Sequence, residues 1–243
     1  MKDKFITITN HELRTPLTVL KGYLELIDYY LQDSKNADLN DAFSVVAETM
    51  KELVCIIEDM HDVSSFNHGK KKLNITELDI KQLLLIIYKE MKVLFENRNI
   101  DLDIRLDDPD VIVQGDYDRI KRSIRELLQN ALKFTPKGGK VTLQYSVNEK
   151  NKKTSIKVID TGIGIPPDKQ SLVFEPFYEI QDPMNHMTSK TEFLGGGIGL
   201  GLTLAKDVFE SHQGTLLLES EVGKGSTFTA VIPYLKLTDV NRN

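Results

Sequence analysis

Apolar residues recur at intervals of three and four along residues 3–33 of the chain. They are Leu13, Leu17, Leu20, Leu24, Ile27 and Leu31. This spacing places them on one side of an α-helix that buries one face. A second series follows over residues 40–66, with the spacing of a heptad seam: Phe43, Val46, Met50, Leu53, Ile57 and Met60. The polar segment between the two series predicts a loop, and hence an antiparallel helical hairpin over residues 1–70.

Two long helices in a hairpin carry more apolar surface than they can cover by themselves. Two copies related by a two-fold axis would bury both seams in a four-helix bundle, so the pattern favours a homodimer formed through the hairpin. Packing of the hairpin on the rest of its own chain is the alternative, and the pattern leaves it open.

The pattern changes over residues 71–243. Helical spacing predicts helices over 81–96, 116–134 and 200–211, and alternation of apolar and polar residues predicts a strand over 100–106. Further strands are predicted over 140–147, 154–160, 214–220 and 226–234. These elements indicate a second domain of the α+β class with an antiparallel or mixed sheet.

Residues 161–197 form a long connection rich in Gly, Pro and polar residues, which predicts a functional lid. Two glycine-rich turns flank it, DTGIGIP at 160–166 and GGGIGLGL at 195–202. Glycine lets backbone amides approach a ligand closely, and the second turn enters a helix whose N-terminus favours phosphate. Either turn alone is equally compatible with an ordinary loop, and neither has the pattern of a Walker or dinucleotide-binding motif.

The segment RELLQNALKF adds polar groups to one helix face. Glu126, Asn130 and Lys133 are spaced by four and three residues, so they share a face opposite the apolar residues. Carboxylate and amide oxygens suit a Mg²⁺ ion that bridges nucleotide phosphates, and a lysine adds positive charge. An ordinary solvated face is the alternative when this helix is considered alone.

Composition narrows the function classes. The 243 residues are 40% hydrophobic and 28% charged, which is typical of a folded globular chain. The net charge of −5 gives no general attraction to nucleic acid or to an anionic membrane. The single cysteine, Cys55, excludes an intrachain disulfide and suggests a reducing compartment.

No apolar run is long enough to span a membrane and no signal peptide is evident, so we expect a cytoplasmic segment without membrane contact. Because the first helical pattern begins at Phe5, we also expect natural sequence upstream, where a membrane anchor would lie.

Five motifs in order resemble those of sensor histidine kinases of two-component signalling. NHELRTPL resembles the H box, RELLQNALKFTPKGG the N box, DTGIGIP the G1 box, FEPFYEI the F box and GGGIGLGL the G2 box. The closing segment ESEVGKGSTFTAVIPY is also similar to the family's C-terminal hairpin, so the resemblance spans residues 3–234. It implies a dimerisation and phosphotransfer hairpin, followed by an ATP-binding α/β sandwich of the type shared with gyrase and Hsp90.

The resemblance assigns roles to residues that match the motifs. His11 would accept the phosphoryl group, Glu12 would act as its acid/base partner, and Thr15 would orient water for dephosphorylating a response regulator receiver domain. In the ATP site, Asn130 would bind Mg²⁺ with Glu126 nearby, Lys133 would contact phosphate, and Asp160 would bind the adenine amino group. The remaining nucleotide-binding positions implied are Gly162, Gly164, Gly197, Gly199, Gly201 and Thr227.

The residue chemistry is compatible with those roles. A neutral imidazole is a competent nucleophile towards a γ-phosphoryl group, and a neighbouring carboxylate can accept the other ring proton. The resemblance then predicts autophosphorylation of His11 by ATP, transfer to an Asp of a response regulator, and phosphatase activity towards that regulator. The other histidines form no ligand spacing and are interpreted as surface or lid residues: His61, His68, His186 and His212.

Three positions depart from the family pattern. Asn10 stands where Ser is frequent, Ile198 where Thr or Ser is frequent, and Glu179 where many members have Arg. Because such an Arg stabilises phosphate charge, a second hypothesis is a scaffold with weakened catalysis that dimerises and binds a regulator. A conformational ATPase of the gyrase and Hsp90 kind is a third, but that class lacks the preceding HELRTP hairpin.

Overall fold

The computed structural model describes residues 13, 16–27, 43, 45–47, 49–50, 53, 57, 73–178 and 199–234. The chain divides into two compact units, Met1–Lys71 and Lys72–Asn243. Every described residue of the first unit is helical. Several apolar residues of the predicted seams are more than half exposed in the single chain: Leu17, Leu24, Phe43, Met50 and Ile57.

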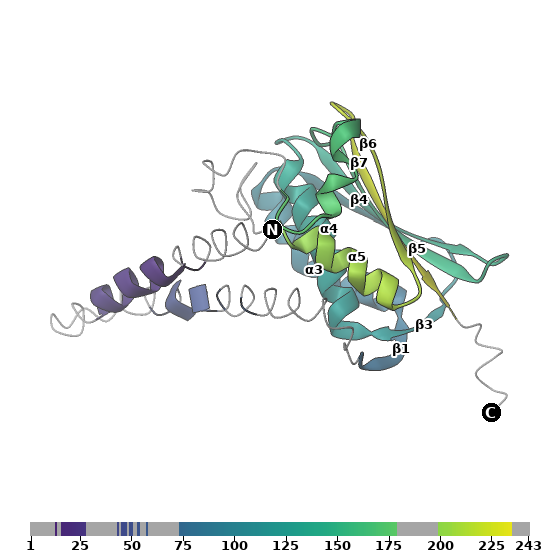
Figure 1. Ribbon diagram of the computed structural model, residues 1–243, viewed down its shortest axis with the longest axis horizontal. Coiled ribbons are helices and arrows are strands. Elements are labelled where there is room, and N and C mark those ends of the chain that lie inside the picture. Colours follow the sequence, from purple (N-terminus) through teal and green to yellow (C-terminus); the bar gives the residue numbers. More distant parts are fainter. Residues whose placement is uncertain are drawn as a thin grey trace. The chain divides into compact units, whose positions relative to one another are not determined.

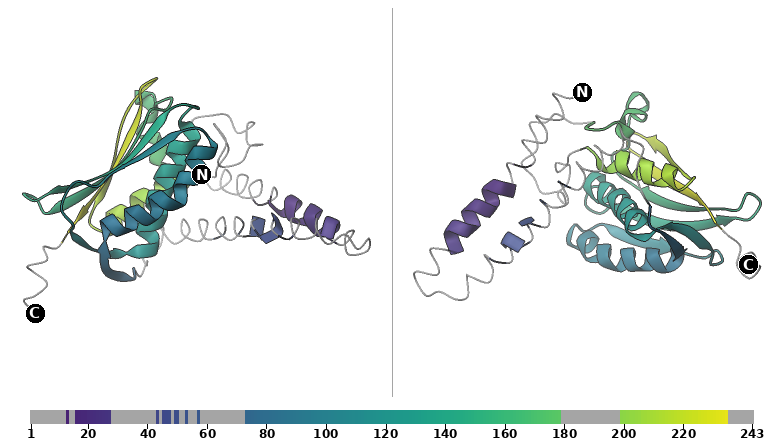
Figure 2. Two further views of the ribbon diagram at one scale, coloured as in Figure 1. Left: turned by 180° about the vertical axis from the view of Figure 1, so that it is seen from behind. Right: turned by 60° about the horizontal axis from the view of Figure 1, so that its bottom comes forward.

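The described part of the second unit contains three α-helices on one face of a five-stranded sheet (Figures 1 and 2). The helices are α3 (Ile80–Asn97), α4 (Tyr117–Phe134) and α5 (Gly201–Ser211). The sheet has the order β2-β4-β5-β7-β6. Its strands are β2 (Asp101–Arg105), β4 (Lys140–Asn148), β5 (Lys153–Asp160), β6 (Thr215–Glu221) and β7 (Gly225–Pro233). Each of these elements lies within one residue of its predicted bounds, which confirms the α+β class.

The sheet is mixed, one of the two arrangements expected. β2 pairs in parallel with β4, and the remaining neighbours pair antiparallel. Side chains on the inner face, such as Val158 and Phe228, are buried beneath the helices, whereas those on the outer face are partly exposed. Apolar side chains of α3 and α4 cover the inner face. Because side chains alternate between the two faces along each strand, only those on the inner face can reach the helices.

A second, two-stranded sheet was not predicted. β1 (Ile75–Asp79) pairs antiparallel with β3 (Ile112–Asp116). Each strand has only five residues, and β3 ends in Gly and Asp, which disfavour strands in isolation. Pairing with a partner distant in sequence overrides that local preference. The first part of the predicted lid is also more regular than expected, because it contains the 3₁₀ turns η1 (Pro167–Lys169) and η2 (Leu172–Phe174).

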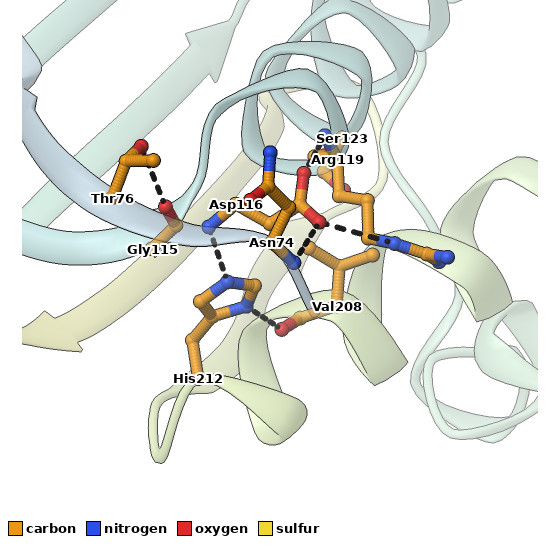
Figure 3. Close-up of polar contacts among 8 residues, drawn as sticks. All are labelled: Asn74, Thr76, Gly115, Asp116, Arg119, Ser123, Val208 and His212. Atoms are coloured by element: carbon orange, nitrogen blue, oxygen red, sulfur yellow. Dashed lines mark hydrogen bonds and ion pairs between the residues drawn. The ribbon is translucent and has the colours of Figure 1, made fainter. Parts of the chain in front are cut away.

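A polar cluster connects the start of α4 to the end of α5 (Figure 3). Asp116 caps α4 by accepting a hydrogen bond from the Arg119 amide at 3.2 Å, and it also accepts one from the Asn74 amide at 3.0 Å. The Asp116 amide donates to Nε2 of His212 at 2.9 Å, and Nδ1 of His212 donates to the Val208 carbonyl at 2.6 Å. This pattern requires a neutral imidazole with its proton on Nδ1.

The prediction that His212 is a surface or lid residue was therefore wrong. Its side chain is only 5% exposed. No local pattern predicts this burial, because the hydrogen-bond partner that decides it is Asp116, 96 positions earlier. Gly115 favours this close packing, because a Cβ atom there would lie 3.2 Å from the imidazole Cδ2 and 2.5 Å from Cδ1 of Ile120.

Replacing His212 with Ala is expected to lower the free energy of unfolding by about 2–4 kcal/mol, because it leaves a buried amide without its acceptor and creates a cavity. Urea unfolding followed by circular dichroism measures the change. Glu210→Ala, at an exposed position two residues earlier in the last turn of α5, serves as the control and is expected to change the value by less than about 0.5 kcal/mol. Equal stability of the two variants would contradict the assigned role of His212.

Candidate nucleotide-binding site

Asp160 ends β5 and lies on the inner face of the sheet, where it is 6% exposed. Its Oδ1 accepts hydrogen bonds from the amides of Gly162 at 2.8 Å and Ser226 at 3.1 Å. Burial raises the pKa of the Asp160 carboxyl above its usual range, and the two amides offset part of that rise. Since both amides bind Oδ1, Oδ2 is the oxygen with which this carboxylate can accept a hydrogen bond from a ligand.

The glycine-rich turn after Asp160 is attached to the end of α4. The Ile163 amide donates to the Phe134 carbonyl at 3.1 Å. A Cβ atom on Gly162 would collide with the same carbonyl, so only glycine allows this approach. Gly164 continues the turn with a φ of +69° and packs against the Glu221 carbonyl. The turn therefore connects Asp160 with both α4 and the β6–β7 hairpin.

The polar face of α4 is arranged as predicted. Glu126, Asn130 and Lys133 are partly exposed, and the residues between them, such as Leu128 and Leu132, are buried. Nζ of Lys133 lies 4.9 Å from the centre of the Phe134 ring, at the end of the helix that contacts the glycine turn. One amide and one carboxylate oxygen on a single helix face, one turn apart, match the donors of a Mg²⁺ ion that keeps most of its waters.

The second glycine-rich turn meets α4 at the start of α5. Gly201 is the first residue of α5, and a Cβ atom there would collide with the Glu126 carboxylate. Gly199 has a φ of +68°, and its carbonyl accepts a hydrogen bond from the Phe177 amide at 2.9 Å. The N-terminus of α5 is therefore adjacent to the polar face of α4, an arrangement that can bind a phosphate next to a cation.

Thr227 lies on the other face of the sheet from Asp160. It pairs with Ile159 and Glu219, and its neighbours Ser226 and Phe228 are buried on the inner face. Thr227 and Ile159 border an open depression of about 350 Å³, which is also lined by Asp160, Ser220 and Ser226 and extends to the exposed hairpin. Ser226, which the sequence interpretation missed, is the residue of this segment whose amide donates a hydrogen bond to the Asp160 carboxylate. The signal available was strand alternation. Ser226 lies one residue before Thr227, so the two side chains point to opposite faces of the sheet, and Ser226 shares the face of Asp160.

Four predicted site residues lie outside the described residues: His11, Glu12, Thr15 and Gly197. The three positions that depart from the family pattern, Asn10, Glu179 and Ile198, also lie outside them. Within the described ranges, no group of three or more His, Cys, Asp or Glu side chains is placed to hold a metal ion. Helices there are too short or too polar to span a membrane.

Comparison with known proteins adds independent evidence. Residues 1–69 match the family model of the His Kinase A (phospho-acceptor) domain. Residues 115–236 match that of the histidine kinase-, DNA gyrase B- and HSP90-like ATPase. The sensor histidine kinase WalK of Bacillus subtilis is 32% identical over 232 residues, which make up 95% of this chain and 36% of WalK. The chain thus spans about a third of that relative's length.

Solved structures share the fold. Full-length ShkA in complex with AMPPNP has a TM-score of 0.69 at 23% identity, covering 96% of this chain and 46% of ShkA. The histidine kinase ThkA in complex with the response regulator TrrA has a TM-score of 0.61 at 22% identity, covering 93% of this chain and 60% of that chain. These likenesses confirm the predicted α/β sandwich. With both family models matched in order along the chain, this protein belongs to the sensor histidine kinases.

Proposed function

We propose that the chain is a kinase core that uses Mg·ATP to phosphorylate His11 and passes the phosphoryl group to an Asp of a response regulator. In this proposal, residues 1–70 are the dimerisation and phosphotransfer domain and residues 71–243 are the ATP-binding domain. The observation that carries the proposal is Asp160, a buried carboxylate whose Oδ1 is bound by two amides, next to both the glycine turn and the end of α4. An amino group of adenine is a suitable partner for its Oδ2.

The other residues of the site would each bind a different part of the Mg·ATP complex. Asn130, with Glu126 one turn away, would hold Mg²⁺, which neutralises charge on the phosphates. Lys133 and the turn that contains Gly197, Gly199 and Gly201 would bind the phosphates. Gly162 and Gly164 shape the turn beside Asp160, and we assign to Ser226, rather than Thr227, the support of that carboxylate.

The chemical step would form a bond between an imidazole nitrogen of His11 and the γ-phosphorus. The bond from that phosphorus to the β–γ bridging oxygen breaks, and ADP leaves. Glu12 would accept the other ring proton and stabilise the charge that develops on the imidazole. Transfer to a receiver Asp then forms an acyl phosphate and returns a neutral His11. Thr15 would position water for hydrolysis of that acyl phosphate, which is the proposed phosphatase activity.

The first unit supports a homodimer as the working form. Its exposed seam residues, including Leu17, Phe43 and Met50, present apolar side chains at helical spacing. A second copy of the hairpin would bury them in a four-helix bundle. The structural relative ThkA forms a complex with a response regulator, and we propose a receiver domain of that kind as the partner of this bundle. We propose a cytoplasmic place of action, within a longer sensor that carries its input domain or membrane anchor upstream.

Incubating the full chain with Mg²⁺ and γ-labelled ATP tests the proposal. The expected product is protein-bound label that is labile in acid, stable in base and absent when EDTA removes the metal. Transfer of that label to a receiver domain is the expected second step. A chain that binds ATP but takes up no label would favour the scaffold hypothesis instead, and label stable in acid would exclude phosphohistidine.

A further inference from the structure

Ser220 and Gln170 connect the glycine turn after Asp160 to the β6–β7 hairpin. The Ile165 amide donates to Oγ of Ser220 at 2.8 Å. Nε2 of Gln170 donates to the Ile165 carbonyl at 3.0 Å and to the Ser220 carbonyl at 2.8 Å. Both backbone polar groups of Ile165 are therefore bound by this pair of residues.

The hydroxyl of Ser220 has its full set of hydrogen bonds. Besides the Ile165 amide, Oγ contacts the Gly225 carbonyl at 3.0 Å and Oγ of Ser226 at 2.9 Å. A hydroxyl has one proton and two acceptor sites. Ser220 can donate its proton to the Gly225 carbonyl while accepting from the Ile165 amide and the Ser226 hydroxyl, so one side chain joins three backbone segments.

This junction determines the surroundings of Asp160. The two amides on Asp160 Oδ1 come from different segments, Gly162 from the turn and Ser226 from β7. Their separation depends on how the turn is seated against the hairpin. One backbone hydrogen bond, from the Gly223 amide to the Ile163 carbonyl at 2.8 Å, contributes to that seating. The Ser220 hydroxyl contributes the contacts nearest to Ser226.

We propose that Ser220, assisted by Gln170, is a positioning residue for adenine recognition. By holding the turn and β7 at a fixed separation, it keeps both amides on Oδ1 and thereby directs Oδ2 towards the 6-amino group of the purine. This inference rests on the proposed function, in which Asp160 binds that amino group. It predicts that the hydroxyl contributes to discrimination between a 6-amino and a 6-oxo purine, and little to binding of ribose and phosphate.

The test compares the affinities of ADP and IDP for the full chain by isothermal titration calorimetry. Ser220→Ala is expected to weaken ADP binding about five- to tenfold, the effect of about one hydrogen bond, and to change IDP binding less than about twofold. Ser220→Thr, which retains the hydroxyl, is expected to restore most of the ADP preference. Ser146→Ala is the matched control, because that hydroxyl pairs with Ser155 at 2.7 Å on strands β4 and β5, away from the turn.

If Ser220 had only a structural role, Ser220→Ala would weaken the binding of ADP and of IDP equally. That result would overturn the inference, as would an unchanged affinity for ADP. Gln170→Leu is a second variant that leaves every hydrogen bond of the Ser220 hydroxyl in place. It too is expected to lower the ADP to IDP preference. A wild-type chain that binds neither nucleotide would overturn the proposed function, whereas normal wild-type binding with no selective loss in either variant overturns this inference alone.

Discussion

His11→Gln is expected to reduce incorporation of γ-phosphate from ATP to background. Glutamine is similar in size to histidine and polar, but its amide nitrogen is not a nucleophile, so the P–N bond cannot form. The change lies in the first unit and leaves the groups around Asp160 unaltered, so ATP affinity is expected to stay within about twofold of wild type. A label assay and a calorimetric titration on the same preparation measure both quantities.

Persistence of label in His11→Gln would contradict the proposed role of His11, because another residue would then be the one that accepts the phosphoryl group. Glu12→Gln provides the matched comparison, because it keeps the nucleophile and removes only the proton acceptor. Its expected loss is about 10²–10⁴-fold in rate, the usual contribution of a general base, rather than loss of the product altogether.

Asp160→Asn is expected to weaken ATP binding by about 100-fold or more and to shift preference towards ITP. The Gly162 and Ser226 amides are both donors, so they will hold the carbonyl oxygen of the new side chain in the place of Oδ1. The amide nitrogen then occupies the place of Oδ2 and presents a donor to the 6-amino group. Loss of a charge-assisted hydrogen bond and creation of an unpaired donor cost about 3–5 kcal/mol together. A 6-oxo purine accepts from the same donor.

Calorimetric titrations with ATP and ITP measure this exchange of preference. Asp168→Asn, at an exposed position of η1, removes the same charge outside the site and is expected to leave both affinities unchanged. Burial raises the pKa of Asp160, so the ionised carboxylate costs the folded state stability at pH values above that pKa. The neutral amide removes this cost, and the variant is expected to remain folded. Retained ATP affinity would exclude Asp160 as the adenine-binding residue.

The secondary structure of the second unit and much of its candidate site could be predicted from periodicity and motifs alone. Each predicted helix and strand of the second unit lies within one residue of its observed bounds, since an apolar stripe on α3 or alternation along β5 reflects which side is buried. The shared face of Glu126, Asn130 and Lys133 follows from helix geometry alone. The glycines at 162, 164 and 201 indicated close backbone approaches, which the structure contains.

Only the tertiary structure decided which distant segments meet. Asp116 and His212 are separated by 96 positions, and the partnership that buries the imidazole has no local signature. The β1–β3 pair likewise forms because a distant partner outweighs weak strand propensity. Strand register places Ser226 on the inner face, together with Asp160, and it places Thr227 on the outer face. A shift of the register by one residue would exchange the faces of Ser226 and Thr227. Sequence determines local periodicity and the types of polar group available, whereas long-range packing determines which of those groups share a site.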